Sequence, residues 1–387
     1  MKKIFVLIDY YLPGYKSGGP LRTISNMVDQ MHEHFDFWIL TRDRDKEDST
    51  SYNGVKVNDW NRVGNANIFY ASPGKLSIRN IRRLISDTQP DIVYLNSFFS
   101  PLQIKYLLCR KLGLVEELPT VLAPRGEFSP GALKIKQTKK STYIAMVKHM
   151  HLYDRLLWQA STQQEEAEIR AVWGSDIKIH VAPDLSPSVF ERNIMRNCPP
   201  TKRAGSVKFV FLSRISPKKN LLFALTVLQN IHDEVLFDIY GPIEDRHYWE
   251  ACLHAIKSLP ANIVVKYRGS MPNDVVPEVL SNYHFFLLPT LGENFGHAIL
   301  EALSSGCPAI ISDQTPWSNL VEQQAGWTLP LSDVERWQEI LQQCVYYDEP
   351  TYLNMSRQAK RYAACWLSRT ENLTSNVSLF TTALATN

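Results

Sequence analysis

The sequence lacks several features that would assign it to other protein classes. It has no run of about 18 consecutive apolar residues, the length that a membrane-spanning helix needs. Its six cysteines never form a Cys-x-x-Cys pair, which disfavours a zinc site and a disulfide framework and favours reduced, buried thiols. The net charge is only +3, so the charge balance gives no reason to expect a nucleic-acid partner.

The first residues imitate a secretory signal only superficially. Two lysines precede an apolar run from Ile4 to Ile8, but Asp9 then interrupts it. A secretory core segment needs about 7–15 apolar residues, so this run is too short. We therefore expect a first β-strand here and a cytoplasmic protein.

The order of strand-like and helix-like segments predicts the domain organisation. A chain of 387 residues is long enough for about two to three domains with substantial cores. Strand and helix patterns alternate through residues 1–190 and again through 206–351, which is typical of doubly wound parallel sheets. The polar, Pro-rich segment 191–205 between them is the expected linker.

The most informative stretch lies in the second half, where the apolar run Phe285–Leu288 predicts a buried strand. A loop with Glu293 follows, and then a short helix carries Glu301. Backbone N–H groups at the start of a helix have no partner within it, and they suit an anionic, hydroxyl-rich ligand. The residues that offer these groups here are Asn294, Phe295 and Gly296.

This stretch resembles a known donor-site signature. It resembles that of retaining glycosyltransferases of family 4 (group 1), which have the GT-B fold. The resemblance consists of the Glu-x7-Glu spacing, Asn-Phe-Gly after the first acid and the Glu-Ala-Leu…Gly-x-Pro tail. The resemblance implies two Rossmann-like domains facing a central cleft, with a C-terminal helix of about 352–387 packing back on the first domain. Without that resemblance, Glu293 and Glu301 would be ordinary solvated charges near a helix end.

Two cations follow the first strand of the second half. Arg214 and Lys219 flank a strand-to-helix turn, where both side chains and the helix dipole can converge on one anion. Lys218 is a rival for Lys219, and surface basicity is the plain alternative. In the family resembled, an Arg and a Lys here hold the donor diphosphate in place of a metal ion, so we expect no metal and no cofactor. Ser270 and Met271 would lie against the nucleotide base.

In the first half, Gly18 and Gly19 precede a helix, and such glycines let a ligand approach the backbone closely. The resemblance places them opposite the donor phosphates. Asp43 and Asp45 form an Asp-x-Asp pair that could bind a metal in the other glycosyltransferase fold, but a loop charge cluster is the favoured interpretation, because the metal-binding one leaves Glu293, Glu301 and the two-domain pattern unexplained.

Acceptor-side residues are expected where strands of the first half end. Arg125 and Gly126 lie in a Pro-Arg-Gly-x-x-Ser-Pro segment that is typical of polysaccharide-assembling members of the family, and Asn96 ends another strand. A surface salt-bridge residue is the less favoured alternative for Arg125. The stretch Lys134–Lys148 mixes lysines with apolar residues, so it is either a surface for anionic lipid or a solvated helix face.

Together with these features, the resemblance implies a metal-independent retaining glycosyltransferase. It would move a sugar from a UDP- or GDP-linked donor to a glycan or polyprenyl-diphosphate-linked acceptor, in capsule or O-antigen synthesis. Arg214, Lys219 and Glu293 would carry catalysis, and the enzyme would be cytoplasmic, with peripheral contact to the membrane's inner face. A nucleotide-sugar 2-epimerase and a non-catalytic two-domain sugar-binding protein are the alternatives.

Overall fold

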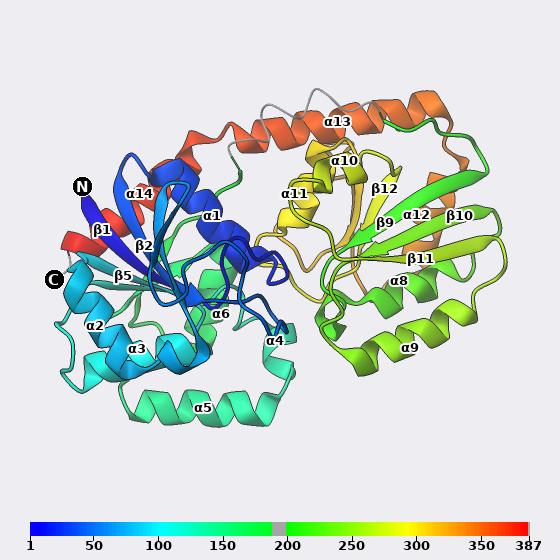
Figure 1. Ribbon diagram of the computed structural model, residues 1–387. Coiled ribbons are helices and arrows are strands. Elements are labelled where there is room, and N and C mark those ends of the chain that lie inside the picture. The colour runs from blue at the N-terminus through cyan, green and yellow to red at the C-terminus, as the bar shows by residue number, and fades with distance from the viewer. Residues whose placement is uncertain (188–198, 386–387) are drawn as a thin grey trace. The chain divides into compact units, whose positions relative to one another are not determined.

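The computed structural model describes residues 1–187 and 199–385 of the chain (Figure 1). Its contacts divide the chain into unit 1, Met1–Ser188 with Thr370–Asn387, and unit 2, Val189–Arg369. The larger part of the expected linker, 191–198, lies outside the described residues. The remainder is fixed to unit 2, because the buried Lys202 ammonium donates to the main-chain oxygens of Val345 (2.8 Å) and Tyr347 (2.9 Å).

Unit 1 contains an eight-stranded sheet in the order β3-β4-β2-β1-β5-β6-β7-β8. All neighbouring strands are parallel except β3, which pairs antiparallel with β4 at one edge. The strands are β1 (Lys2–Leu7), β2 (Phe35–Arg42), β3 (Trp60–Val63), β4 (Ala66–Ala71), β5 (Ile92–Asn96), β6 (Thr120–Ala123), β7 (Leu157–Ala160) and β8 (Lys178–Val181).

Apolar side chains cover both faces of this sheet, because successive residues of a strand point to opposite sides. In β1, Ile4 and Val6 pack in one hydrophobic cluster, and Phe5 and Leu7 pack in the other. The helices of unit 1 are α1 (Gly19–Met31), the 3-10 turn η1 (Pro73–Lys75), α2 (Ile78–Thr88), α3 (Pro101–Lys111), α4 (Pro130–Lys134), α5 (Gln137–His149), α6 (Gln163–Trp173) and α14 (Thr370–Ala385).

Unit 2 contains a parallel six-stranded sheet in the order β11-β10-β9-β12-β13-β14 around a core of its own. Its strands are β9 (Ser206–Leu212), β10 (Glu234–Tyr240), β11 (Ile263–Gly269), β12 (Phe285–Leu288), β13 (Ala309–Ser312) and β14 (Gly326–Leu329). Its helices are the 3-10 turn η2 (Pro217–Lys219), α8 (Leu221–Leu228), α9 (Arg246–Lys257), α10 (Val276–Leu280), α11 (His297–Ser304), α12 (Val334–Tyr346) and α13 (Glu349–Leu367). The expectation of two parallel-sheet α/β domains is confirmed.

The C-terminal helical region differs from the expected single helix of about 352–387. It forms two helices, α13 and α14, with Ser368 as the C-cap of the first. Tyr352, Ala359 and Ala363 of α13 belong to the core of unit 2, whereas Leu379 and Phe380 of α14 belong to that of unit 1. Thus α14 packs on the first domain, and α13 is part of unit 2 (Figure 1).

Candidate functional site

The sheet order of unit 2 identifies the edge where a ligand is expected to bind. Strand order reverses direction between β9 and β12, since β10 lies on one side of β9 and β13 lies beyond β12. In open α/β sheets, ligands bind outside the carboxyl ends of the strands at such a topological switch point. The loops that leave β9 and β12 here carry Lys219 and Glu293, respectively.

The structure brings Lys219 and Glu293 together as an ion pair between Nζ and Oε1. The two side chains are only 10% and 13% exposed, so the pair is largely shielded from water. The two loops are also joined through Lys218, whose main-chain oxygen accepts hydrogen bonds from Leu291 N–H (2.8 Å) and the Thr290 hydroxyl (3.1 Å). Lys219 is therefore the residue of the lysine pair that reaches Glu293, while its neighbour joins the loops through the backbone.

The loop after Glu293 is held by backbone contacts and by Trp317. Glu293 N–H donates to Gln314 O (2.9 Å), and the Trp317 indole N–H donates to Phe295 O (2.6 Å). Gly296 has φ 83°, and a Cβ there would lie 2.8 Å from Ile299 Cδ1, so this position requires glycine. Trp317 is 3% exposed and packs in the core of unit 2.

The other donor-side residues of unit 2 lie on neighbouring elements. Glu301 is on α11 and is 4% exposed. Asn294 is partly buried in the loop that leads to this helix. Ser270 is exposed directly after β11, and Met271 packs partly against the core. The donor-binding roles of these residues stay predictions.

Arg214 has a partner that the sequence analysis missed. Its Nη1 lies 2.8 and 2.9 Å from the two carboxylate oxygens of Glu244, in the loop after β10. Gly241 makes this approach possible: its φ is 136°, and a Cβ there would lie 1.9 Å from Ser213 O. The signal in the sequence was the Gly-Pro turn after a buried strand, since parallel strands bring such turns to one edge.

In unit 1 the strand order reverses between β1 and β5. Gly18, in the loop after β1, has φ 71° and precedes α1, in which Gly19 is the first residue. Asn96 ends β5, and its Oδ1 accepts a hydrogen bond from Arg125 Nε (2.8 Å). The structure thus brings two of the three predicted acceptor-side residues into contact. The predicted cleft, which would join residues of both units, stays a prediction.

Arg125 is a buried residue and not a surface one. Its guanidinium donates to Asp184 and to the Tyr94 hydroxyl, in addition to Asn96. The Arg125 and Asp184 side chains are only 7% and 4% exposed. Burial by itself would lower the pKa of Arg125, but the facing Asp184 and Tyr94 raise it above its ordinary value. Arg125 does form a salt bridge, but the interpretation that this salt bridge lies on the surface is wrong, because the side chain of its partner Asp184 is buried.

Two carboxylates beside Arg125 were also missed, the buried Glu165 and the partly buried Glu127. The Glu165 carboxylate accepts N–H bonds from Gly126 (2.6 Å) and Ser161 (2.7 Å). Glu127 accepts the Ser97 hydroxyl (2.7 Å) and the Phe98 N–H. Burial raises the pKa of Glu127 to about 7, and these donors and Lys140 oppose that rise only in part.

The Asp-x-Asp pair is engaged in contacts with the protein itself. Asp43 pairs with Arg44 (2.8 Å), and Asp45 accepts the backbone N–H groups of Tyr15 (2.7 Å) and Lys16 (3.0 Å). These contacts support the loop interpretation of the pair. Within 1–187 and 199–385, no three His, Cys, Asp or Glu side chains are grouped so that they could hold a metal ion.

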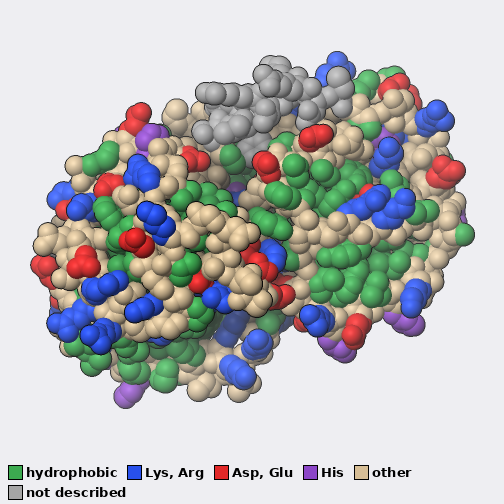
Figure 2. All heavy atoms as spheres, viewed as in Figure 1, with side chains coloured by type: hydrophobic (Ala, Val, Ile, Leu, Met, Phe, Trp, Pro, Cys, Tyr) green, Lys and Arg blue, Asp and Glu red, His purple; other side chains and the backbone are tan. Residues whose placement is uncertain are grey.

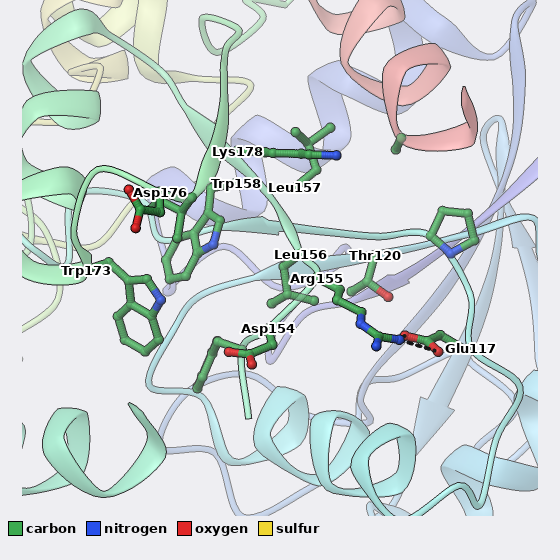
Figure 3. Close-up of a pocket in the computed structure, with 14 residues that line it drawn as sticks. Glu117, Thr120, Asp154, Arg155, Leu156, Leu157, Trp158, Trp173, Asp176 and Lys178 are labelled. Atoms are coloured by element: carbon green, nitrogen blue, oxygen red, sulfur yellow. Dashed lines mark hydrogen bonds and ion pairs between the residues drawn. The ribbon is translucent and has the colours of Figure 1, made fainter. Parts of the chain in front are cut away.

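A cavity of about 750 Å³ lies in unit 1 at the amino ends of β6, β7 and β8, away from the edge just described (Figure 3). Trp158 and Trp173 lie on one side of it and Arg155 and Glu117 on the other. Arg155 is paired with Glu117 (3.2 Å), and Trp158 is fully buried. Asp154, Asp176 and Lys178 also line the cavity, and none of its lining residues was predicted to be part of the site.

Comparison with known proteins adds information on the family and the fold. Residues 199–362 match the model of the family glycosyl transferases group 1. The chain is 26% identical over 189 residues to the Escherichia coli UDP-Gal:alpha-D-GlcNAc-diphosphoundecaprenol alpha-1,3-galactosyltransferase. That alignment covers 45% of this chain and 46% of the enzyme, so it spans about half of the relative's length.

Several solved structures resemble the whole chain. HepE of Anabaena in complex with UDP-glucose has a TM-score of 0.67 at 16% identity, covering 99% of both chains. Sucrose-phosphate synthase of Thermosynechococcus elongatus has a TM-score of 0.71 at 13% identity, covering 100% of both. WaaG, a glycosyltransferase involved in lipopolysaccharide biosynthesis, has a TM-score of 0.65 at 13% identity, covering 97% of this chain and 98% of WaaG. At these identities the likeness establishes the fold alone.

Proposed function

We propose that the chain is a glycosyltransferase that transfers a sugar from a nucleoside-diphosphate sugar to an acceptor hydroxyl, because residues 199–362 match the family model of glycosyl transferases group 1 and the chain has the GT-B fold. The observation that carries this proposal is the shielded Lys219–Glu293 pair at the switch point of unit 2. Both residues lie inside the segment that matches the family.

The pair offers the two kinds of group that a nucleotide sugar needs. The leaving diphosphate gains negative charge as the glycosidic C–O bond breaks, and a fixed ammonium stabilises that charge more in the transition state than in the ground state. A carboxylate accepts hydrogen bonds from sugar hydroxyls, each contributing about 1.5–3 kcal/mol. In our proposal Lys219 turns to the diphosphate when donor binds, and Glu293 turns to the sugar.

Arg214 is the second cation assigned to the diphosphate. Its partner Glu244 is 27% exposed and Arg214 is 33% exposed, so solvent screens this pair and an anionic ligand can compete for the guanidinium. With two cations for the leaving group, the proposed reaction needs no metal ion. Glu301 is assigned to the ribose hydroxyls, and the anomeric configuration is proposed to be retained.

The acceptor is proposed to be lipid-linked. The relative from Escherichia coli carries a GlcNAc-diphosphoundecaprenol acceptor in its name, and WaaG is described as acting in lipopolysaccharide biosynthesis. We therefore propose a diphospholipid-linked sugar as acceptor and a UDP-sugar as the first donor to test, with a GDP-sugar as the second. A role in O-antigen or capsule synthesis at the cytoplasmic face of the membrane follows from that chemistry.

The α4–α5 region is the surface proposed to meet the membrane. It contains no acidic residue between Phe128 and Tyr153, and in α5 only Val147 is buried. Ile135, Met146 and Met150 are 40–50% exposed beside several lysines. Figure 2 shows hydrophobic, basic and His side chains along the lower edge of unit 1, where α5 runs. Among the described residues no helix is both long and apolar enough to cross a bilayer.

A donor panel tests the function. The protein is incubated with UDP-, GDP- and CMP-sugars and a synthetic GlcNAc-diphospholipid, and the products are identified by mass. Transfer to the lipid supports the proposal. An isomerised nucleotide sugar would instead indicate an epimerase, and binding without turnover would indicate a sugar-binding protein. For the variant Lys219→Ala, the matched control is Lys218→Ala, which keeps the backbone contacts of residue 218 and leaves Lys219 in place.

A further inference from the structure

The switch point of unit 1 contains a second, separate arrangement of polar groups. The loop after β5 begins at Ser97, and the loop after the neighbouring strand β6 contains Glu127. The Ser97 hydroxyl donates to Glu127 Oε1 (2.7 Å), and the Phe98 N–H donates to Oε2. These contacts place a hydroxyl and a carboxylate at the edge of the sheet where an acceptor is expected to bind.

Ser97 has a backbone conformation that favours glycine. Its φ is 144°, and a residue with a side chain in such a region costs about 1–3 kcal/mol and persists only where its surroundings impose the conformation. The surroundings do so here: Phe98 is fixed through its N–H by Glu127 and through its oxygen by the Tyr153 hydroxyl (2.8 Å). A serine that carries this cost, partly exposed at a ligand-binding edge, indicates a use for its hydroxyl.

The charged and titratable groups around Glu127 are few. Lys140 of α5 is partly buried, donates its ammonium to Ala132 O (2.6 Å) and favours the ionised carboxylate. Tyr143 and Tyr153 are hydrogen-bonded to each other (2.8 Å), and burial raises the pKa of both hydroxyls, so they stay neutral near pH 7. Burial lowers the pKa of Lys140, and Glu127, with a pKa of about 7, changes charge in the neutral range.

We propose that Ser97 contacts the acceptor hydroxyl and that Glu127 is the positioning residue that sets the direction of the Ser97 hydroxyl. The inference rests on the proposed function and adds residues on the acceptor side. When Glu127 is ionised, Ser97 donates to it and presents lone pairs outward. Those lone pairs accept the acceptor's O–H, which leaves the acceptor oxygen's own lone pairs directed at the sugar.

When Glu127 is neutral, this arrangement reverses. The carboxyl proton can be donated to Ser97 Oγ, and the Ser97 O–H then points outward. In that state the Ser97 O–H donates a hydrogen bond to the acceptor oxygen and occupies a lone pair that would otherwise attack the sugar. Use of the acceptor is therefore expected to increase as pH rises through the pKa of Glu127, while donor binding in unit 2 is unaffected.

The experiment measures kcat/KM for the synthetic GlcNAc-diphospholipid between pH 5.5 and 9, together with the KM of the donor. For one group with a pKa of about 7, the ionised fraction rises from about one-eleventh at pH 6 to ten-elevenths at pH 8, so we expect a roughly tenfold increase in the wild type. Glu127→Gln cannot ionise and should flatten the profile. Glu117→Gln, an exposed carboxylate elsewhere in unit 1, is the control that should keep it.

Ser97→Gly is the second test and does not depend on the folding of the Glu127 variant. Glycine accepts φ 144° without strain, so the melting temperature should stay the same or rise. The same change removes the hydroxyl, so kcat/KM for the acceptor should fall at least tenfold at pH 8 with the donor KM unchanged. Wild-type acceptor use in Ser97→Gly, or an unchanged pH profile in Glu127→Gln, would overturn the inference while the proposed function stood. Absence of transfer by the wild type would overturn both.

Discussion

Arg125 and Arg214 are both predicted site residues, yet the structure predicts that protein stability depends strongly on the ion pair of Arg125 and only weakly on that of Arg214. Arg125 and Asp184 are 7% and 4% exposed, whereas Arg214 and Glu244 are 33% and 27% exposed. Removing one partner of a buried pair leaves an uncompensated charge and costs about 3–5 kcal/mol. Breaking an exposed pair costs about 0–1 kcal/mol. We therefore expect Arg125→Ala to destabilise the protein strongly and Arg214→Ala hardly at all.

The structure also predicts where the destabilisation occurs. In Arg125→Ala, Asp184 loses the guanidinium and keeps the neutral hydroxyls of Thr23 (3.0 Å) and Ser161 (3.2 Å), and Asn96 loses its contact with Arg125 Nε. All of these residues belong to unit 1, while unit 2 has a separate core. The loss should therefore be confined to unit 1.

Hydrogen exchange followed by mass spectrometry suits this test, because a protein with two cores need not unfold in one step. Peptides from β5 to β8 should exchange faster in Arg125→Ala by a factor that corresponds to ~3–5 kcal/mol, and peptides from β9 to β14 should not change. The double variant Arg125→Ala/Asp184→Ala should be less destabilised than the sum of the single variants, because no buried charge remains. A loss below about 1 kcal/mol, or an equal effect in both units, would refute the reasoning.

Further predictions concern the donor site and pH. Lys219→Ala and Glu301→Ala should each reduce turnover at least tenfold, which corresponds to ~1.4 kcal/mol of transition-state stabilisation. The circular dichroism spectra of both variants should match that of the wild type. Wild-type rates in both variants would discredit the donor site. Trp317→Phe loses the 2.6 Å hydrogen bond to Phe295 O and should lower stability by about 1 kcal/mol and raise the donor KM, as measured by thermal melts and initial rates. For Glu127, the folded-state pKa of about 7 lies above the unfolded value of 4.5. The stability that this difference contributes is therefore fully present below pH 4.5 and is lost as pH rises through 7. The free energy of unfolding should fall by ~3 kcal/mol in total from this group. Urea titrations of Glu127→Gln should show a weaker decline over that range than the wild type, and identical curves would contradict the assigned burial.

The sequence alone determined the parts of this protein that depend on local patterns. Continuous apolar runs such as Phe285–Leu288 and the regular alternation with helices predict two parallel sheets, because only buried strands tolerate such runs. The family resemblance assigned Lys219 and Glu293 to one site, and their places in the chain agree with it. Each follows the carboxyl end of a strand, and parallel strands end at a common edge.

Only the tertiary structure decided which groups face each other across the chain. Arg125 is buried because Asp184, after β8, lies against it, and Glu127 has Ser97 as a partner because β5 and β6 are neighbours in the sheet. Glu244 reaches Arg214 because β10 pairs with β9. The break between α13 and α14 separates two helices that pack on different cores. Such contacts depend on strand order and register, and side-chain patterns along one segment carry no information about either until the sheet is assembled.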